Sequence, residues 1–385
     1  MKDDRIKKKK TEKKPASALN VMKGVEGGHD GLKPKSPRPD KSVPRGNNKV
    51  LDISTDEYIK GVLKGDRVLL SRAITLIESN ARRHQEQAQE VLKAIMPHTG
   101  KSIRIGVTGV PGAGKSTLIE NFGCYLLERG HKVAVMAVDP SSVRTRGSIL
   151  GDKTRMEKLA QAEAAFIRPS PSGGTLGGVA RKTRETMMLF EAAGYDVLLV
   201  ETVGVGQSEI TVRSMVDFFM LMLITGAGDE LQRIKKGVFE MADMIIVNKA
   251  DNTNARAAEI ARGEYERALH YLQPVTVGWD TCALTTSALN GVGIDEVWWK
   301  IEKFREITAA NGEFAKRRRE QARDWLYSLV DEKLHEAFNQ AQTVKEILPG
   351  LEQEVMQGKT PAVQAAQMLV KAFKTHINRE WKLDD

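Results

Sequence analysis

The sequence predicts an α/β protein of the P-loop NTPase class, with a mainly parallel sheet covered by helices and with helical extensions at both ends. Short apolar runs alternate with helical patterns from Ser102 to about residue 297, and this alternation is typical of a parallel sheet with helices on both faces. A glycine-rich phosphate-binding motif directly follows the first run, as it does in nucleotide-binding folds. We therefore expect the nucleotide motifs at the carboxyl ends of the strands.

The first 50 residues form a basic tail whose composition differs from the rest of the chain. They contain 15 Lys/Arg and 6 Asp/Glu, which accounts for the whole formal charge of +9. They offer few apolar residues to bury, so we expect disorder. The remaining residues hold 44 basic and 44 acidic side chains, which argues against a basic nucleic-acid-binding face. Neither a secretory signal nor a mitochondrial presequence matches the tail.

Residues 51–100 are predicted to form a helical extension. Ser54 and Glu57 have the spacing of a capping box that opens a first helix. Asp66 precedes an apolar face with helical spacing, and a charged helix follows and ends near Pro97.

Residues 101–304 are predicted to form the nucleotide-binding domain. Its expected strands are 103–108, 132–138, 195–200, 218–224, 244–247 and 275–277. Residues 305–385 return to helical spacing, and Thr360 with Pro361 is expected to open the last helix as N-cap and first residue.

The segment after the first strand matches GxxxxGK[ST] at every fixed position. Its glycines let backbone N–H groups turn toward phosphate oxygens, and the helix that follows adds a favourable dipole. We expect Lys115 to neutralise the β- and γ-phosphates and the Ser116 hydroxyl to ligate Mg²⁺. The predicted phosphate-binding residues are Gly109, Val110, Pro111, Gly112, Ala113, Gly114, Lys115, Ser116 and Thr117.

A second motif, Asn248-Lys249-Ala250-Asp251, follows the fifth strand and predicts guanine as the base. The Asp251 carboxylate can accept hydrogen bonds from guanine N1–H and the 2-amino group, and adenine offers neither donor. Asn248 is expected to brace the loop and the Lys249 stem to cover the base. A later turn, with Ser287, Ala288 and Leu289, is expected to read guanine O6 through backbone N–H.

Two acidic residues that end strands, Asp139 and Glu201, are candidate metal ligands with Ser116. The alternative for each, a solvated acid or a helix cap, stays open. Gly204, in the sequence Glu201-Thr-Val-Gly204, would donate its N–H to the γ-phosphate.

The sequence also predicts slow hydrolysis. Small GTPases place a water-orienting Gln directly after this glycine, whereas this chain has Val205. Asp152 is our candidate for positioning the water. The predicted catalytic residues are therefore Lys115, Asp152, Glu201 and Gly204.

These motifs, with the segments 138–142, 146–152 and 201–209, together resemble the MeaB/MMAA family of methylmalonyl-CoA mutase-associated GTPases. The resemblance covers about 52–385. It implies a GTP/GDP- and Mg²⁺-dependent chaperone that gates adenosylcobalamin loading and protects methylmalonyl-CoA mutase or a related acyl-CoA mutase. It also implies GTPase activity stimulated by the mutase, a homodimer formed through the C-terminal helices of 305–385, and a further switch at 226–237. By position, it implies that Asp152 serves the metal together with Asp139 and Glu201.

Two other functions remain open. One is a GTPase metallochaperone for metalloenzyme maturation, but the two cysteines, Cys124 and Cys282, and the seven histidines do not cluster. The other is a nucleic-acid-associated GTPase, and the basic tail is the one sequence feature that suggests it. No apolar run is long enough to span a membrane, and the two separated cysteines suit buried thiols in a reducing cytoplasm.

Overall fold

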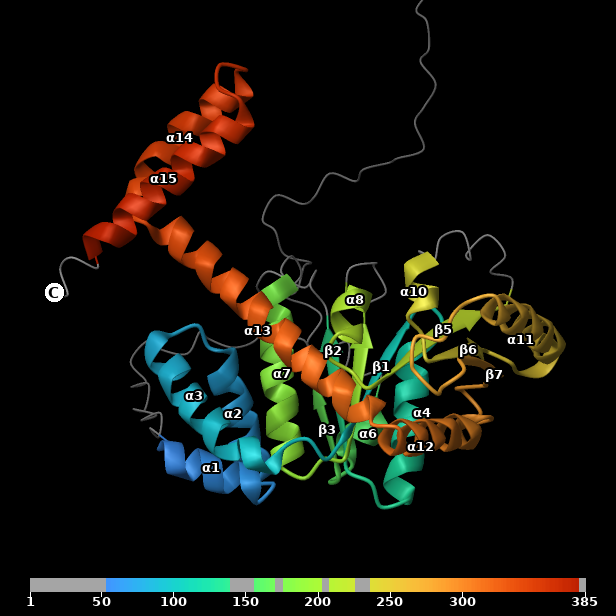
Figure 1. Cartoon of the computed structure of the whole chain (residues 1–385). Coiled ribbons are helices and arrows are strands. Elements are labelled where there is room, and N and C mark those ends of the chain that lie inside the picture. The colour runs from blue at the N-terminus through green and yellow to red at the C-terminus, as the bar shows by residue number, and fades with distance from the viewer. Residues whose placement is uncertain (1–52, 139–155, 170–175, 203–207, 226–235, 381–385) are drawn as a thin grey trace, which may run out of the picture. The chain divides into compact units, whose positions relative to one another are not determined.

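The structure, a computed structural model, describes residues 53–138, 156–169, 176–202, 208–225 and 236–380. Within these residues seven strands form one sheet in the order β3-β2-β4-β1-β5-β6-β7, and every neighbouring pair is parallel (Figure 1). The strands are β1 Ile103–Gly109, β2 Val133–Val138, β3 Ala165–Arg168, β4 Val197–Thr202, β5 Phe218–Ile224, β6 Met244–Asn248 and β7 Cys282–Thr285. All seven carboxyl ends lie at one edge, and the predicted parallel α/β architecture is confirmed.

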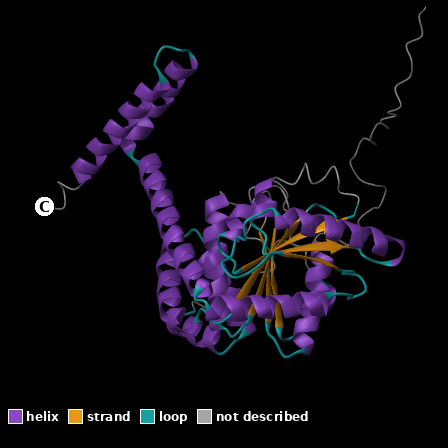
Figure 2. Ribbon diagram, turned by 45° about the vertical axis from the view of Figure 1, so that its right-hand side comes forward, coloured by secondary structure: helices purple, strands orange, loops and turns teal. Residues whose placement is uncertain are grey.

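Helices cover both faces of this sheet (Figure 2). Along β4, Val197 and Leu199 belong to one apolar cluster, while Leu198 and Val200 belong to a second. Neighbouring side chains of a strand point to opposite faces, so a strand that is apolar throughout needs cover on both. The first cluster is completed by α4 (Lys115–Glu128), α6 (Glu157–Gln161) and α12 (Ile294–Ala310). The second is completed by α7 (Leu176–Ala192), α8 (Ser208–Arg213), α10 (Lys236–Glu240) and α11 (Ala255–His270).

Three α-helices precede the sheet, α1 (Thr55–Leu63), α2 (Arg67–Glu78) and α3 (Arg82–Ile95), and a 3-10 turn, Met96–His98, follows them. The predicted capping box opens α1, because the Ser54 N–H donates to the Glu57 carboxylate at 2.8 Å and the Glu57 N–H donates to Ser54 Oγ at 3.3 Å. The Asp66 carboxylate accepts from two N–H groups in the first turn of α2. Apolar side chains of all three helices join the second cluster, so this extension packs on the same core as α7.

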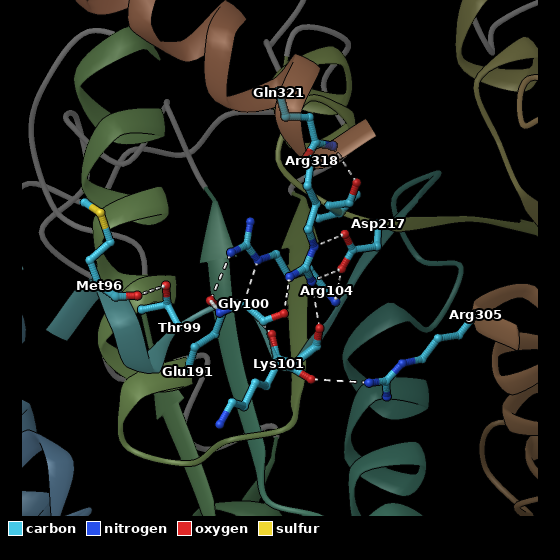
Figure 3. A network of polar contacts seen from close by, with 12 residues as sticks. Met96, Thr99, Gly100, Lys101, Arg104, Glu191, Asp217, Arg305, Arg318 and Gln321 are labelled. Atoms are coloured by element: carbon cyan, nitrogen blue, oxygen red, sulfur yellow. Dashed lines mark hydrogen bonds and ion pairs between the residues drawn. The ribbon is translucent and has the colours of Figure 1, made fainter. Parts of the chain in front are cut away.

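Three helices follow α12: α13 (Glu313–Gln340), α14 (Gln342–Met356) and α15 (Ala362–Glu380). The beginning of α13 is held by ionic contacts (Figure 3). The Arg318 guanidinium donates to both carboxylate oxygens of Asp217, at 2.8 and 2.6 Å, and to the Gly100 carbonyl oxygen at 2.7 Å. Asp217 also accepts the backbone N–H of Arg104 at 2.8 Å. Since Asp217 directly precedes β5 and Arg104 lies at the start of β1, α13 is attached near the amino ends of the strands.

Three local predictions from the sequence were wrong. Residues 275–277 are not a strand: Thr276 and Trp279 form an isolated antiparallel bridge around Gly278, whose φ is +81°. The sheet instead contains β3 and β7, two four-residue strands that were not predicted as strands, because runs this short carry little periodicity. The last helix begins after Pro361, whose carbonyl accepts the Ala365 N–H at 3.0 Å. Thr360 is therefore not its N-cap.

Cys124 and Cys282 were expected to be buried thiols, and both are only partly buried. None of the helices within the described residues has both the length and the apolar character that a membrane span requires.

Candidate nucleotide site

The P-loop connects β1 to α4 at the carboxyl edge of the sheet. Gly109 is the last residue of β1, and Gly114 is the residue before the first turn of α4. Gly114 has a φ of +91°, and a Cβ at this position would lie 2.7 Å from the side-chain nitrogen of Asn248. The loop conformation therefore requires glycine at Gly114 on two grounds, backbone strain and space.

Lys115 is the first residue of α4, and its ammonium group folds back over the loop. Its Nζ donates to the carbonyl oxygen of Gly109 at 2.9 Å and to that of Val110 at 3.3 Å. Burial lowers the pKa of Lys115, and the nearby carboxylates of Glu201 and Glu209 act in the opposite direction. The positive charge is thus held among carbonyl oxygens, where an incoming phosphate can replace them as its partner.

Ser116 and Glu201 form an oxygen pair beside this lysine. The Ser116 hydroxyl, in the first turn of α4, donates to Glu201 Oε1 at the end of β4 across 2.9 Å. Hydroxyl and carboxylate oxygens are the donors that Mg²⁺ prefers, so the two residues suit the predicted metal. Asp139, Asp152 and Gly204, predicted to complete the metal and γ-phosphate contacts, lie outside the described residues.

The base loop begins where β6 ends. The Asn248 side-chain amide donates to the Ala113 carbonyl oxygen at 2.7 Å, and its Oδ1 accepts the Ala288 N–H at 2.9 Å and the Thr286 hydroxyl at 3.1 Å. Asn248 is 2 % exposed. One side chain therefore connects the P-loop to both predicted base-reading segments, which is more than the bracing of its own loop that the motif predicted.

Lys249 and Asp251 complete the base loop. Lys249 has a φ of +62°, the one positive φ of a non-glycine residue in the described ranges. Its carbonyl oxygen accepts the Asn254 side-chain amide at 2.7 Å, and Asn254 in turn accepts the Thr225 hydroxyl at 2.7 Å. The Asp251 carboxylate accepts the Ser287 hydroxyl at 3.0 Å. The two predicted base-reading segments, which are far apart in sequence, thus meet in the fold.

Two residues at the site were absent from the sequence prediction. Asn121, on α4, donates its side-chain amide to the Ala288 carbonyl oxygen at 2.6 Å. Asn254 holds the Lys249 carbonyl, as described above. Neither belongs to a sequence motif, and each acts through a contact that only the folded chain creates. No signal in a single sequence could have identified them.

Comparisons with known proteins identify the family to which the chain is similar. A family model described as methylmalonyl Co-A mutase-associated GTPase MeaB matches residues 70–343. The GTPase ArgK of Escherichia coli is 52 % identical over 278 residues, which cover 72 % of this chain and 84 % of that protein. The mouse mitochondrial methylmalonic aciduria type A homolog is 43 % identical over 330 residues, covering 83 % of this chain and 80 % of that protein.

A solved structure is similar over most of the chain as well. The crystal structure of a protein described as a LAO/AO transport system kinase has a TM-score of 0.68 and 40 % identity, and the match covers 83 % of this chain and 97 % of that one.

Proposed function

This chain belongs to the MeaB family of methylmalonyl-CoA mutase-associated GTPases, and from that premise we propose a specific role for it. It binds GTP with Mg²⁺, hydrolyses it to GDP and phosphate, and acts as a chaperone of methylmalonyl-CoA mutase or a related acyl-CoA mutase. In that role it gates adenosylcobalamin loading and protects the mutase. The observation that carries the nucleotide part is the bond between Asn248 and the Ala113 carbonyl, because it joins a phosphate-binding loop to a guanine-reading one.

The phosphates of GTP are bound by the P-loop N–H groups and by the N-terminal end of α4. Lys115 leaves the carbonyl oxygens of Gly109 and Val110 and neutralises the β- and γ-phosphates. The hydroxyl of Ser116 and the carboxylate of Glu201 would hold the magnesium ion, together with Asp139 and Asp152. A magnesium ion held there would supply positive charge that offsets the negative charge developing on the phosphates.

Guanine is selected by Asp251, which the Ser287 hydroxyl orients. A carboxylate at this position finds two donors on guanine and none on adenine, and leaving it unpaired against adenine is costly. This supports GTP over ATP as the substrate. The solved relative is described as a transport system kinase, and selection of guanine argues against an ATP-dependent kinase activity for this chain.

Hydrolysis is proposed to be slow in the isolated protein. Val205 occupies the position of the water-orienting glutamine of small GTPases. Asp152, Gly204 and a partner protein are proposed to complete the arrangement around the γ-phosphate. The segment 226–237 is proposed to be the switch that communicates with the mutase.

A homodimer is proposed to form through the C-terminal helices. On α13, Leu326, Tyr327, Val330 and Leu334 are exposed, and exposed apolar side chains that cluster on one element are typical of interfaces. The proposed division of the chain is 1–50, 51–100, 101–304 and 305–385, although α12 continues past the third boundary to Ala310. A cytoplasmic location is also proposed, and cell fractionation would test it.

The deciding experiment measures GTP turnover by the purified protein, alone and with saturating methylmalonyl-CoA mutase. A slow basal rate that rises at least about ten-fold with the mutase is the expected result, since partners of slow GTPases accelerate turnover by far more. An unchanged rate would leave the GTPase in place and reject this mutase as the partner. Absence of GTP turnover under both conditions would reject the whole proposal.

A further inference from the structure

Asn121 lies on α4, in the helix that the P-loop begins, and contacts a turn 167 positions later in the chain. Its side-chain nitrogen donates to the Ala288 carbonyl oxygen at 2.6 Å and lies 3.3 Å from the Thr117 carbonyl oxygen of its own helix. The contact is separate from the bond between Asn248 and Ala113. Asn248 connects the P-loop to the turn 287–289 indirectly, through its bonds to Ala113 and Ala288. Asn121 adds a direct bond between α4 and the same turn.

We propose that Asn121 is a positioning residue that fixes the Leu289 N–H of the turn 287–289 for reading guanine O6. The inference rests on the proposed GTPase function. A peptide unit is planar and trans, so the Leu289 N–H points opposite to the Ala288 carbonyl of the same unit. Anchoring that carbonyl therefore fixes the direction of the Leu289 N–H.

The neighbouring peptide unit is fixed as well. The Ala288 N–H donates to Asn248 Oδ1 at 2.9 Å, so Asn248 and Asn121 hold the two units on either side of Ala288. The turn is closed by reciprocal backbone bonds between Ser287 and Val292, at 3.1 and 3.2 Å. Ser287 and Ala288 are 1 % and 2 % exposed. Without the Asn121 amide, the Ala288–Leu289 unit loses the anchor on its carbonyl side.

Preorganised donors discriminate between ligands because they do not reorganise on binding. An N–H that is held toward O6 favours a base with a strong acceptor at that position. Loss of the anchor is expected to weaken this preference while leaving the contacts of Asp251 with N1–H and the 2-amino group in place. The two halves of base recognition can therefore be separated by the choice of nucleotide.

The test measures dissociation constants of the nucleotide-free protein for GDP, 6-thio-GDP and IDP. 6-Thio-GDP keeps N1–H and the 2-amino group but has sulfur, a weaker acceptor, at position 6, and IDP lacks only the 2-amino group. Asn121→Ala is expected to weaken GDP binding about five-fold, the effect of one hydrogen bond. Its preference for GDP over 6-thio-GDP should shrink by the same factor, and its preference for GDP over IDP should stay at the wild-type value.

Two further variants control the experiment. Asn311→Ala removes another asparagine whose side-chain amide donates to a backbone carbonyl, that of Val277 at 2.9 Å, but outside the nucleotide site. It should change none of the three constants. Asn121→Asp keeps the size of the side chain and cannot donate, so it should show the same loss of preference. It replaces the alanine variant in the test if that variant does not fold.

The outcomes separate this inference from the proposed function. If wild-type protein does not prefer GDP over IDP, the proposed base reading itself fails. If wild-type protein shows that preference, and Asn121→Ala keeps the full preference for GDP over 6-thio-GDP, only the role of Asn121 is rejected. An equal loss of affinity for all three nucleotides would also reject it, because general support of the loop would explain such a result.

Discussion

The side-chain nitrogen of Asn248 lies 2.7 Å from the carbonyl oxygen of Ala113, and this bond joins the loop proposed to read the base to the loop proposed to bind phosphate. Both partners are buried, at 2 % and 0 % exposure. Water therefore cannot replace a bond that is lost here, and the contact is expected to matter for stability as well as for nucleotide binding.

Asn248→Ala should destabilise the nucleotide-free protein by about 2–4 kcal/mol, because it leaves the buried Ala113 carbonyl and the Ala288 N–H without their partner. Urea denaturation monitored by circular dichroism would measure the change. Asn311→Ala, on the surface turn after α12, is the matched control and should lose less than about 1 kcal/mol. Equal losses of unfolding free energy in the two variants would show that the Asn248 contact stabilises the protein no more than the exposed Asn311 contact does.

Gly114→Ala and Gly112→Ala form a second matched pair. Both glycines have positive φ, at +91° and +79°, but a Cβ at Gly112 meets no atom within 4 Å, whereas one at Gly114 lies 2.7 Å from the Asn248 amide. Both variants should therefore carry backbone strain of about 1–2 kcal/mol, and Gly114→Ala should lose about 1–2 kcal/mol more because it displaces Asn248. Melting temperatures of the nucleotide-free variants would decide, and equal melting temperatures would contradict the prediction.

Lys115→Ala should abolish GTP hydrolysis or reduce it at least about a hundred-fold, because the phosphate charge would no longer be neutralised. Phosphate release under single-turnover conditions measures the effect. Lys300→Ala removes a lysine on α12 that contacts Trp299, and it should hydrolyse GTP at the wild-type rate. Hydrolysis by Lys115→Ala at that same rate would mean that the site has been assigned to the wrong loop.

Asp251→Asn should shift the base preference of the protein from guanine toward xanthine. The asparagine amide can donate to the carbonyl oxygen that xanthine carries where guanine has its amino group, so XDP should bind better and GDP worse, by roughly a hundred-fold in their ratio. The side-chain oxygen of the introduced asparagine would still accept the Ser287 hydroxyl, which leaves the loop in place. A GDP to XDP ratio equal to that of the wild type would remove Asp251 from base recognition.

Glu191 should make stability depend on pH in the acid range. Burial raises the pKa of this carboxyl group, but the Arg104 guanidinium and hydrogen bonds from Ser102 and Gly100 outweigh burial, and its pKa is lowered. A carboxylate with a lowered folded-state pKa contributes its full stability above the unfolded value, about 4.3. That contribution is lost as the pH falls through the lower folded value.

Glu191→Gln should therefore lower the free energy of unfolding by about 3 kcal/mol at pH 7, because it breaks a buried ion pair. Below about pH 4 the decrease should be smaller. Urea denaturation between pH 7 and pH 3 measures both. Glu336→Gln is the control: its pairing with Lys333 is exposed, and its loss should stay within about 1 kcal/mol at every pH. If the loss of stability in Glu191→Gln did not vary with pH, the stabilising contribution would not come from the ionised carboxylate of Glu191.

The sequence was sufficient for the class of fold and the identity of the main nucleotide motifs. Strands buried on both faces carry continuous apolar runs, which is why β1, β2, β4, β5 and β6 were located within two residues. The P-loop and the sequence 248–251 are local signals, because each motif is a short stretch that its residue types and spacing identify without any tertiary contact. The capping box at Ser54 and Glu57 is local for the same reason.

Only the tertiary structure decided how these pieces meet. The edge strands β3 and β7 are too short to show a period, and their pairing with β2 and β6 defines them. The bonds from Asn248 to Ala113 and from Asn121 to Ala288 join residues more than a hundred positions apart. Such contacts form only when the helices and loops at the carboxyl edge of the sheet pack against one another. A single sequence determines the groups that can bond, and the packing of the core determines which of them come within reach.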